Sequence, residues 1–415
     1  MKKGLKALVV GIVALAGTAA LVLLAMRYLV TATFDPPQRA GPPALVMPDG
    51  DPQVWLVTTQ EERRVVGGMD GVATETLQHV ELRSFDSRTA RPLWKRRMLT
   101  LADERGRVAP RARILGQDGN VVWLFIADQP VAVAALDGEV RATRSHLEEK
   151  NPALRGLLPD KLDFYAFDAG LVITAADARR HLVGGTDWLA RDYRPASDDH
   201  FRRITFNATQ WNGGWRTADF TTRHGTVLGR WLGLHSDAEA ADAGDDGFGD
   251  KIKDPTRVRT ESSPVRRALR QARIGRTKVF SEGSHPRLFD VAAIPGRADY
   301  LDAGFLVAAG TRLPLELASP RGVVVVHRTR ADAQGRMAMT RLDERLNSAW
   351  TATLPFAEIA NRWQMPDRLI LYGPVPDTDA RPGRQHEGIA VLGLDSGAWR
   401  GWNVGLEQEI AAAPR

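Results

Sequence analysis

The region between residues 52 and 405 is a succession of short apolar or alternating runs, separated by Gly, Asp or Pro. Because no long segment with a helical period intervenes between these runs, the pattern predicts an all-β domain. About twenty strands are too many for a simple sandwich, so the pattern favours a β-propeller of about seven or eight blades. The expected strands are 53–58, 77–85, 93–101, 120–126, 130–136, 139–143, 161–167, 171–175, 178–183, 201–208, 215–221, 226–232, 300–308, 322–328, 337–342, 348–354, 367–373, 387–394 and 398–402.

A weak internal repeat supports the propeller prediction. The stretch Leu82–Trp94 reads as a strand, an Asp-led turn and a second strand that ends in Trp, and Val391–Trp399 is a shortened version. Ala135–Val140 contains a third turn of this type. Asp-led turns close tight hairpins, and Trp side chains can pack between neighbouring sheets. Asp-Gly hairpins also occur in other all-β proteins, so the repeat favours a propeller only modestly.

The segment from Ser84 to Trp94 resembles the repeat of quinoprotein-type (PQQ-like) β-propellers. That repeat reads small residue, x, Asp, x, x, Thr, Gly, x, x, x, Trp. Asp86, Thr89 and Trp94 match it, Ser84 stands in for the small residue, and Ala90 replaces the Gly. The plan of one N-terminal span, a proline-rich spacer and a propeller-like body also resembles uncharacterised membrane-anchored proteins of Gram-negative bacteria. These resemblances imply a fold and a location, but no reaction.

The N-terminal region contains one long apolar segment. Ala7–Met26 comprises 20 residues without a charge, which as a helix would span about 30 Å, the thickness of the hydrocarbon core of a bilayer. Three lysines precede it, so the positive-inside rule places the N-terminus in the cytoplasm and the main domain in the periplasm. We therefore expect a retained single-pass anchor in the inner membrane. The alternative is a signal peptide cleaved near Val30-Thr31-Ala32.

These features predict the organisation of the whole chain. Six prolines between Asp35 and Pro52 favour an extended spacer that holds the domain away from the membrane. The expected parts are a cytoplasmic stub at 1–6, a transmembrane anchor at 7–30 that crosses the membrane with 7–26, a spacer at 31–51, the propeller-like domain at 52–405 with a charged insertion at 236–278, and a C-terminal tail at 406–415.

The charged insertion 236–278 separates its acids from its bases. Asp237–Asp250 contains six acids and no base, whereas Lys251–Lys278 contains ten bases and two acids. Ser236 and Glu239 have the spacing of a capping box, which predicts a short helix that continues to Ala243. A second helix is predicted near Val265–Ala272, because Ser263-Pro264 supplies an N-cap and a first helical residue.

Three interpretations of the insertion remain open. Asp242, Asp246 and Gly247 match part of a calcium-binding loop, but Gly244 and Lys253 occupy positions that should supply oxygen ligands. The basic half could instead bind anionic lipid headgroups or an acidic partner near a membrane. Otherwise, the two halves are solvated or neutralise each other.

The sequence predicts no catalytic, cofactor-binding or metal-binding residue and no cofactor. The chain has no cysteine, its nine histidines form no HxH or HExxH pair, and it lacks GxSxG and GxxxxGK[ST] motifs. Asp198-Asp199-His200 could in principle support acid–base chemistry, but adjacent residues on a strand point to opposite faces and the neighbouring Pro195 indicates a loop tip.

The charge balance and the lack of motifs favour binding over catalysis. The net charge is +6, and four bases with no acid lie in the first thirty residues, so the remainder is near neutral and does not fit a nucleic-acid binder. We expect a periplasmic scaffold or binding module that presents a loop-lined face to another envelope protein. The alternatives are a quinoprotein-type enzyme, and a binder of a small ligand or polysaccharide through Trp211 and Trp215.

Overall fold

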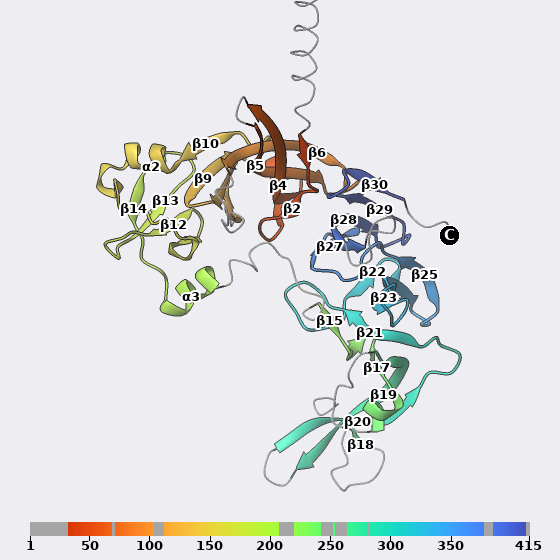
Figure 1. Ribbon diagram of the computed structural model, residues 1–415. Coiled ribbons are helices and arrows are strands. Elements are labelled where there is room, and N and C mark those ends of the chain that lie inside the picture. Colours follow the sequence, from red (N-terminus) through yellow and green to blue (C-terminus); the bar gives the residue numbers. More distant parts are fainter. Residues whose placement is uncertain are drawn as a thin grey trace, which may run out of the picture. The chain divides into compact units, whose positions relative to one another are not determined.

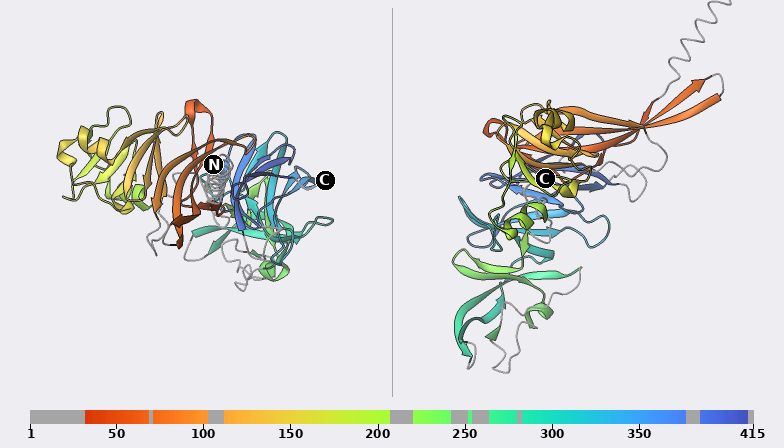
Figure 2. Two further views of the ribbon diagram at one scale, coloured as in Figure 1. Left: turned by 45° about the horizontal axis from the view of Figure 1, so that its top comes forward. Right: turned by 90° about the vertical axis from the view of Figure 1, so that its left-hand side faces the viewer.

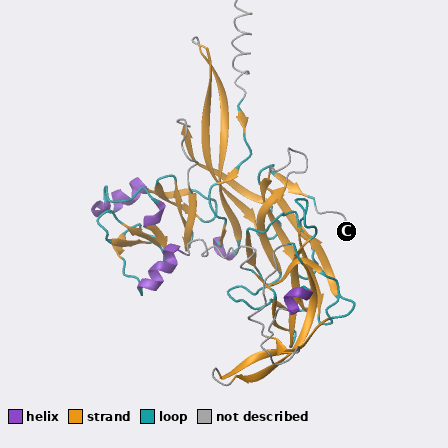
Figure 3. Ribbon diagram, turned by 60° about the horizontal axis from the view of Figure 1, so that its bottom comes forward, coloured by secondary structure: helices purple, strands orange, loops and turns teal. Residues whose placement is uncertain are grey.

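The structure is a computed structural model (Figure 1). Its strands form five antiparallel sheets with few and short helices (Figure 3), which confirms the all-β prediction. The described strands do not close into a barrel or propeller. The chain divides into two compact units, the first made of 1–42, 55–84 and 94–194, and the second of 43–54, 85–93 and 195–415. The structure describes residues 32–68, 71–102, 112–206, 220–241, 252–253, 264–279, 283–376 and 385–411.

Three short strands of the first sheet come from the segment that was expected to be a spacer. Three short strands from 33–46 pair with β4, and Ala44 and Val46 are fully buried, so this segment is part of the domain. Its prolines lie between the strands, where a missing N–H breaks no ladder hydrogen bond. The strands are β1 (Thr33–Phe34), β2 (Gln38–Arg39), β3 (Ala44–Val46), β4 (Gln53–Gly68), β5 (Gly71–Asp86) and β6 (Pro92–Ala102), with a 3-10 helix at Pro48–Gly50.

The first unit also contains two four-stranded sheets that follow the chain in order. Trp123 and Phe125 of one sheet share a core with Leu171 and Ile173 of the other. The first of these sheets contains β7 (Ala112–Asp118), β8 (Val121–Ile126), β9 (Gln129–Ala134) and β10 (Val140–Thr143), and the second contains β11 (Tyr165–Phe167), β12 (Leu171–Thr174), β13 (Arg180–Val183) and β14 (Ala190–Asp192). Helix α2 (Arg144–Lys150) and 3-10 helices at Pro152–Leu154 and Leu162–Phe164 connect them.

The strand predicted at 201–208 is wrong. Residues Asp198–Phe206 form helix α3. The Ser197 hydroxyl accepts a hydrogen bond from the backbone N–H of His200 at 3.0 Å, and Asp198 and Asp199 lie in the first turn. An N-cap serine followed by acids stabilises a helix start, and these local signals outweigh the apolar alternation that favoured a strand.

The second unit contains one eleven-stranded sheet and one five-stranded sheet. The eleven-stranded sheet follows the path β16-β17-β19-β21-β23-β24-β25, and the five-stranded sheet (blue strands in Figure 2) follows β26 to β30 in order. Residues 408–410, expected in a C-terminal tail, form the last strand. The larger sheet contains β15 (Thr221–Thr222), β16 (His224–Val227), β17 (Arg230–His235), β18 (Ile252–Lys253), β19 (Arg266–Val279), β20 (Gly283–Ala293), β21 (Tyr300–Leu306), β22 (Glu316–Ala318), β23 (Arg321–Arg328), β24 (Met337–Asp343) and β25 (Ser348–Thr353). The other contains β26 (Asn361–Gln364), β27 (Arg368–Pro376), β28 (Gln385–Gly393), β29 (Trp399–Asn403) and β30 (Gln408–Ile410).

Of the two helices predicted in the charged insertion, one is confirmed and one is wrong. Ser236 and Glu239 exchange reciprocal hydrogen bonds of 3.1 and 3.0 Å, which form the capping box of helix α4 (Asp237–Ala241). In the second segment, predicted near Val265–Ala272, residues 266–272 belong instead to β19, where Leu269 lies opposite Leu234 of β17 and is almost fully buried. Pairing with neighbouring strands on both sides overrides a weak local helix preference.

In the first unit, a tryptophan contact joins consecutive sheets. The Trp94 indole N–H on β6 donates to the carbonyl oxygen of Leu136 at 3.0 Å, in the turn between β9 and β10. Gly138 of that turn has a φ of 71°, and a Cβ added there would lie 2.6 Å from the Trp94 ring. A glycine therefore serves two purposes here, since it permits the left-handed turn and lets the indole lie against the backbone.

The second unit repeats this contact. The Trp350 indole N–H on β25 donates to the carbonyl oxygen of Leu394 at 3.1 Å, in the turn between β28 and β29. Gly397 has a φ of 67°, and a Cβ added there would lie 2.6 Å from the Trp350 ring. Two of the three predicted Asp-led turns thus receive a Trp from the preceding sheet, which is the packing role expected of these side chains.

The N-terminal predictions lie outside the described residues. These are the stub at 1–6 and the anchor at 7–30. Among the residues that the structure does describe, no helix has both the length and the apolar composition required to cross a bilayer.

Candidate functional site

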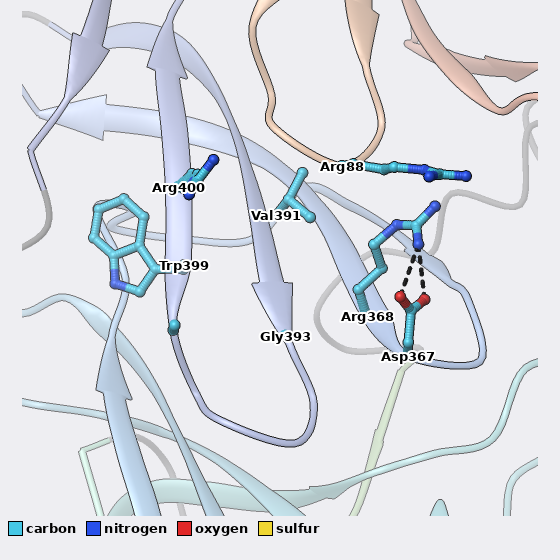
Figure 4. Close-up of a pocket in the computed structure, with 8 residues that line it drawn as sticks. Arg88, Asp367, Arg368, Val391, Gly393, Trp399 and Arg400 are labelled. Carbon is cyan, nitrogen blue, oxygen red and sulfur yellow. Dashed lines mark hydrogen bonds and ion pairs between the residues drawn. The ribbon is translucent and has the colours of Figure 1, made fainter.

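A cavity of about 450 Å³ opens beside the five-stranded sheet of the second unit (Figure 4). The turn between β5 and β6, the start of β27, and strands β28 and β29 supply its walls. Its lining contains three guanidinium groups and a single carboxylate, so the cavity is positively charged. The lining residues are Arg88, Asp367, Arg368, Val391, Gly393, Ala398, Trp399 and Arg400.

The Arg368 guanidinium is held in a fixed orientation at one side of the cavity. Its Nη1 donates to both carboxylate oxygens of Asp367, at 2.8 and 3.0 Å, and its Nε donates to the carbonyl oxygen of Ser87 at 3.0 Å. The side chain is only 14% exposed. Charge-assisted hydrogen bonds of this kind hold a guanidinium in one orientation, so Arg368 is in place before a ligand arrives.

Arg88 is presented by a rigid Asp-led turn. The Asp86 carboxylate accepts hydrogen bonds from the backbone N–H of Arg88 at 2.8 Å and of Thr89 at 2.6 Å, and from the Thr89 hydroxyl at 2.8 Å. Burial opposes ionisation of Asp86, but these hydrogen bonds outweigh it and lower its pKa. Ala90, which replaces the Gly of the PQQ-like repeat, keeps the left-handed φ of 61°.

The Arg88 side chain itself forms only one weak, exposed ion pair. Its Nη2 lies 3.7 Å from the Asp51 carboxylate, and the two side chains are 68% and 83% exposed. Exposed ion pairs contribute little because water screens them and because two long side chains must be ordered. A ligand can therefore compete with Asp51 for this guanidinium.

Arg400 is the most available cation in the cavity. It lies opposite Val391 in the β28–β29 ladder, its side chain is exposed, and it has no ion-pair partner among the described residues. The neighbouring Trp399 points to the other face of the strand, as Figure 4 shows, and packs against the apolar core. Trp399 is half-buried and still lines the cavity.

The residue types that line this cavity are suited to holding an anion. Its eight lining residues include no His, Ser, Thr or Cys, and Asp367 is held by Arg368. No group of three or more potential metal-ligating side chains exists in the described part of the chain. Arginine matches carboxylate and phosphate geometry through paired N–H donors, so the arrangement can hold such a group.

The charged insertion contains a second ionic cluster, and it is buried. Glu239 has a fully buried side chain and accepts hydrogen bonds from Arg267 at 2.9 Å and from Arg223 at 2.5 Å. Asp237 pairs with Arg270. In the described residues, the acidic half of the insertion thus neutralises part of the basic half, as one of the three interpretations proposed.

The pKa of Glu239 reflects its surroundings. Burial favours the neutral acid, but hydrogen bonds from Arg267 and from the Ser236 backbone, together with the charges of Arg267 and Arg223, lower the pKa below its ordinary value. The carboxylate is therefore ionised and fixes helix α4 to strand β19.

The other positions considered from the sequence do not form a site among the described residues. Asp198 and Asp199 are exposed in the first turn of α3, where they favour the helix start. The partial calcium loop at Asp242–Gly247 lies outside the described residues. The same applies to Trp211 and Trp215.

The sequence pattern assigned no binding role to any residue of this cavity. Arg88, Arg368 and Arg400 are single members of a set of 56 bases, with no spacing that relates them. The sequence distinguishes two of them only by position. Arg88 lies within the PQQ-like segment, and Arg400 follows Trp399, the last residue of the shortened repeat at 391–399.

No protein-family model matches this sequence, and a search of the curated proteins found no match. The function of the arginine cavity must therefore be inferred from its own geometry.

Proposed function

We propose that this protein is a binding module of the cell envelope whose arginine cavity holds a carboxylate of a partner protein. The observation that carries the proposal is the excess of guanidinium groups around one cavity, with Arg400 lacking an ion-pair partner among the described residues. A carboxylate placed between Arg88 and Arg400 would receive hydrogen bonds from planar N–H donors.

The size and shape of the cavity favour a side chain or a chain end over a large ligand. A volume of about 450 Å³ is near the lower end of the range for ligand sites. Trp399 packs against the apolar core, which reduces the ring surface on which a saccharide could stack. An acidic residue on the surface of another envelope protein fits these features.

The proposal includes the finer architecture expected from the sequence. We place the binding site on a PQQ-like β-propeller of about seven or eight blades. Two features support this: the four-stranded sheets follow each other along the chain, and Trp94 and Trp350 each contact the turn of the next sheet.

The proposal also keeps the expected location. Residues 7–26 would anchor the chain in the inner membrane, with 1–6 in the cytoplasm and the domain in the periplasm. The support is the uncharged length of 7–26 and the lysines before it. Sedimentation with membranes after alkaline washing would test the anchor, and release into the soluble fraction would contradict it.

We expect Arg400→Glu to reduce capture of the partner at least tenfold, because a hydrogen bond to a charged group contributes about 1.5–3 kcal/mol and the variant adds repulsion. A photo-crosslinking amino acid placed at Ala398, an exposed lining residue, would report contact at the cavity in intact cells. Captured proteins would be isolated through a C-terminal tag and identified by mass spectrometry.

The matched control is Arg155→Glu, which reverses the charge of an exposed arginine in the other unit. Equal capture by Arg400→Glu and by this control would contradict the carboxylate site.

Two further measurements test the alternative functions. Quinone absorbance in the purified protein would indicate the enzyme alternative, and a tryptophan fluorescence change on addition of polysaccharide would indicate the saccharide alternative.

A further inference from the structure

Two histidine rings and one tryptophan ring lie together on the β16–β17 hairpin, directly before the charged insertion. The His224 ring of β16 stacks on Trp231 of β17 with the centroids 5.9 Å apart. The His235 ring, at the end of β17, lies 5.7 Å from His224 and 5.9 Å from Trp231. A Cβ added at Gly233 would lie 2.6 Å from the Trp231 ring and 3.1 Å from His235, so this glycine leaves room for the three rings. We call these three side chains the ring cluster.

Both imidazoles of the ring cluster have a buried nitrogen without a hydrogen-bond partner among the described residues. These atoms are His224 Nδ1 and His235 Nε2, and His235 as a whole is only 2% exposed. Protonation of an imidazole turns both of its nitrogens into N–H donors. A charged group with a buried donor and no acceptor costs more than a neutral nitrogen left unpaired. The surroundings therefore favour the neutral form of both rings.

The ion pairs next to the ring cluster are already balanced. They join side chains that precede β16 or lie on α4, β19 and β21, and Arg270 Nε also donates to the carbonyl oxygen of His235 at 3.3 Å. Each of the three carboxylates in this group has an arginine partner, so an added positive charge would find no free counter-charge there. The group consists of Arg223, Arg267, Arg270, Asp237, Glu239 and Asp302.

These surroundings lower the pKa of both histidines. Burial lowers the pKa of His235 to about 4; the charges of His224, Arg270 and Arg223 act in the same direction, and Glu239 opposes them. Burial, followed by the charge of Arg223, also lowers the pKa of His224. In a locally opened state, both imidazoles would meet water and titrate near their ordinary pKa of 6.5. The closed state is therefore fully stable above pH 6.5 and loses stability as the pH falls from 6.5 towards the lowered pKa values.

We propose that the ring cluster is an acid-sensitive switch, which keeps helix α4 and strand β16 packed on β17 near neutral pH and releases them in acid. Protonation adds up to two positive charges beside Arg223 and Arg270, and opening relieves this repulsion by exposing the imidazoles to water. Release of α4 separates its two carboxylates from the arginines of β19 and so changes the charge that this part of the unit presents. The switch uses no residue of the arginine cavity, so either proposal can fail without the other.

Hydrogen–deuterium exchange of the full chain in dodecyl maltoside micelles, read by mass spectrometry and corrected for the intrinsic pH dependence of exchange, tests this switch. From pH 6.5 to pH 5, we expect the opening constant of peptides from β17 to rise roughly tenfold or more, because the opened state binds protons that the closed state excludes. Strand β8, which has no ionisable side chain, is the internal reference and should show no such rise. The pKa of Glu239 lies below 4.5, so this carboxylate stays ionised over the range measured.

The double variant His224→Phe/His235→Phe should abolish the rise in β17, since neither side chain can then take up a proton. His224→Gln/His235→Gln tests the same point with smaller neutral side chains, in case the phenyl rings disturb the packing. The matched control is His181→Phe, which removes a half-buried histidine of the first unit and should leave the rise unchanged. An equal change in β8 and β17, or a rise that persists in both double variants, would overturn the proposal.

Discussion

Glu239→Gln is expected to lower the free energy of unfolding by about 3–5 kcal/mol, the usual cost of removing one partner from a buried ion pair. The Glu239 side chain is fully buried, and that of Arg267 is only 3% exposed. Without the carboxylate, the Arg267 guanidinium would stay buried, with Asp302 at 3.8 Å as a more distant counter-charge. The variant would also weaken the capping box of α4, since Glu239 accepts from the Ser236 N–H.

Denaturant unfolding followed by tryptophan fluorescence would measure this loss. Glu344→Gln is the matched control, since Glu344 is 56% exposed and lies 3.4 Å from Arg321, so its loss should cost less than about 1 kcal/mol. The double variant Glu239→Gln/Arg267→Met should recover much of the stability, because it leaves no uncompensated buried charge. Similar stability losses in Glu239→Gln and Glu344→Gln would mean that the buried network does not hold the insertion in place.

The same network makes a prediction about pH. Because the folded-state pKa of Glu239 lies below its ordinary value of 4.5, its contribution to stability is present above pH 4.5 and is lost as the pH falls through the lowered pKa. The stability difference between the native protein and Glu239→Gln should therefore be constant near neutrality and shrink in acid. Unfolding curves between neutral and acidic pH would test this, and a constant difference throughout would contradict it.

Gly397→Ala is expected to lower the free energy of unfolding by about 2–5 kcal/mol. The backbone of Gly397 has a φ of 67°, which costs an L-residue about 1–2 kcal/mol. The new Cβ would also lie 2.6 Å from the Trp350 ring, and overpacking of this kind costs about 1–3 kcal/mol. The indole would have to move and would lose its hydrogen bond to Leu394.

Gly296→Ala separates these two contributions. Gly296 has a φ of 71° and no atom within 4 Å of its added Cβ, so only the backbone cost of about 1–2 kcal/mol applies. The double variant Gly397→Ala/Trp350→Leu should show a smaller loss than the sum of its parts, since the two residues are in contact. Equal losses in Gly397→Ala and Gly296→Ala would show that the tryptophan contact contributes nothing.

Local signals predicted those elements whose stabilising contacts lie close in the sequence. The capping box at Ser236 and Glu239 forms because its two groups are three residues apart. The turn at Asp86 forms because that carboxylate binds the next N–H groups along the chain. The strand predicted at 201–208 is wrong because the Ser197 side chain caps the start of a helix there, and this local signal is stronger than the apolar alternation.

The candidate sites could not be predicted in this way. Arg368 is fixed by the carbonyl oxygen of Ser87, which is 281 residues away in the sequence. Nothing in the sequence around Arg368 or Ser87 indicates that these two residues will be in contact.

The sequence by itself therefore determined the all-β class, the Asp-led turns and the start of α4, because strand alternation, turn chemistry and capping act over a few residues. Only the tertiary structure decided that 266–279 is a strand, that the short strands at 33–34, 38–39 and 44–46 pair with β4, and that the cavity arginines converge. The physical reason is that backbone pairing and burial between distant segments outweigh weak local preferences, and no local pattern encodes which segments will meet.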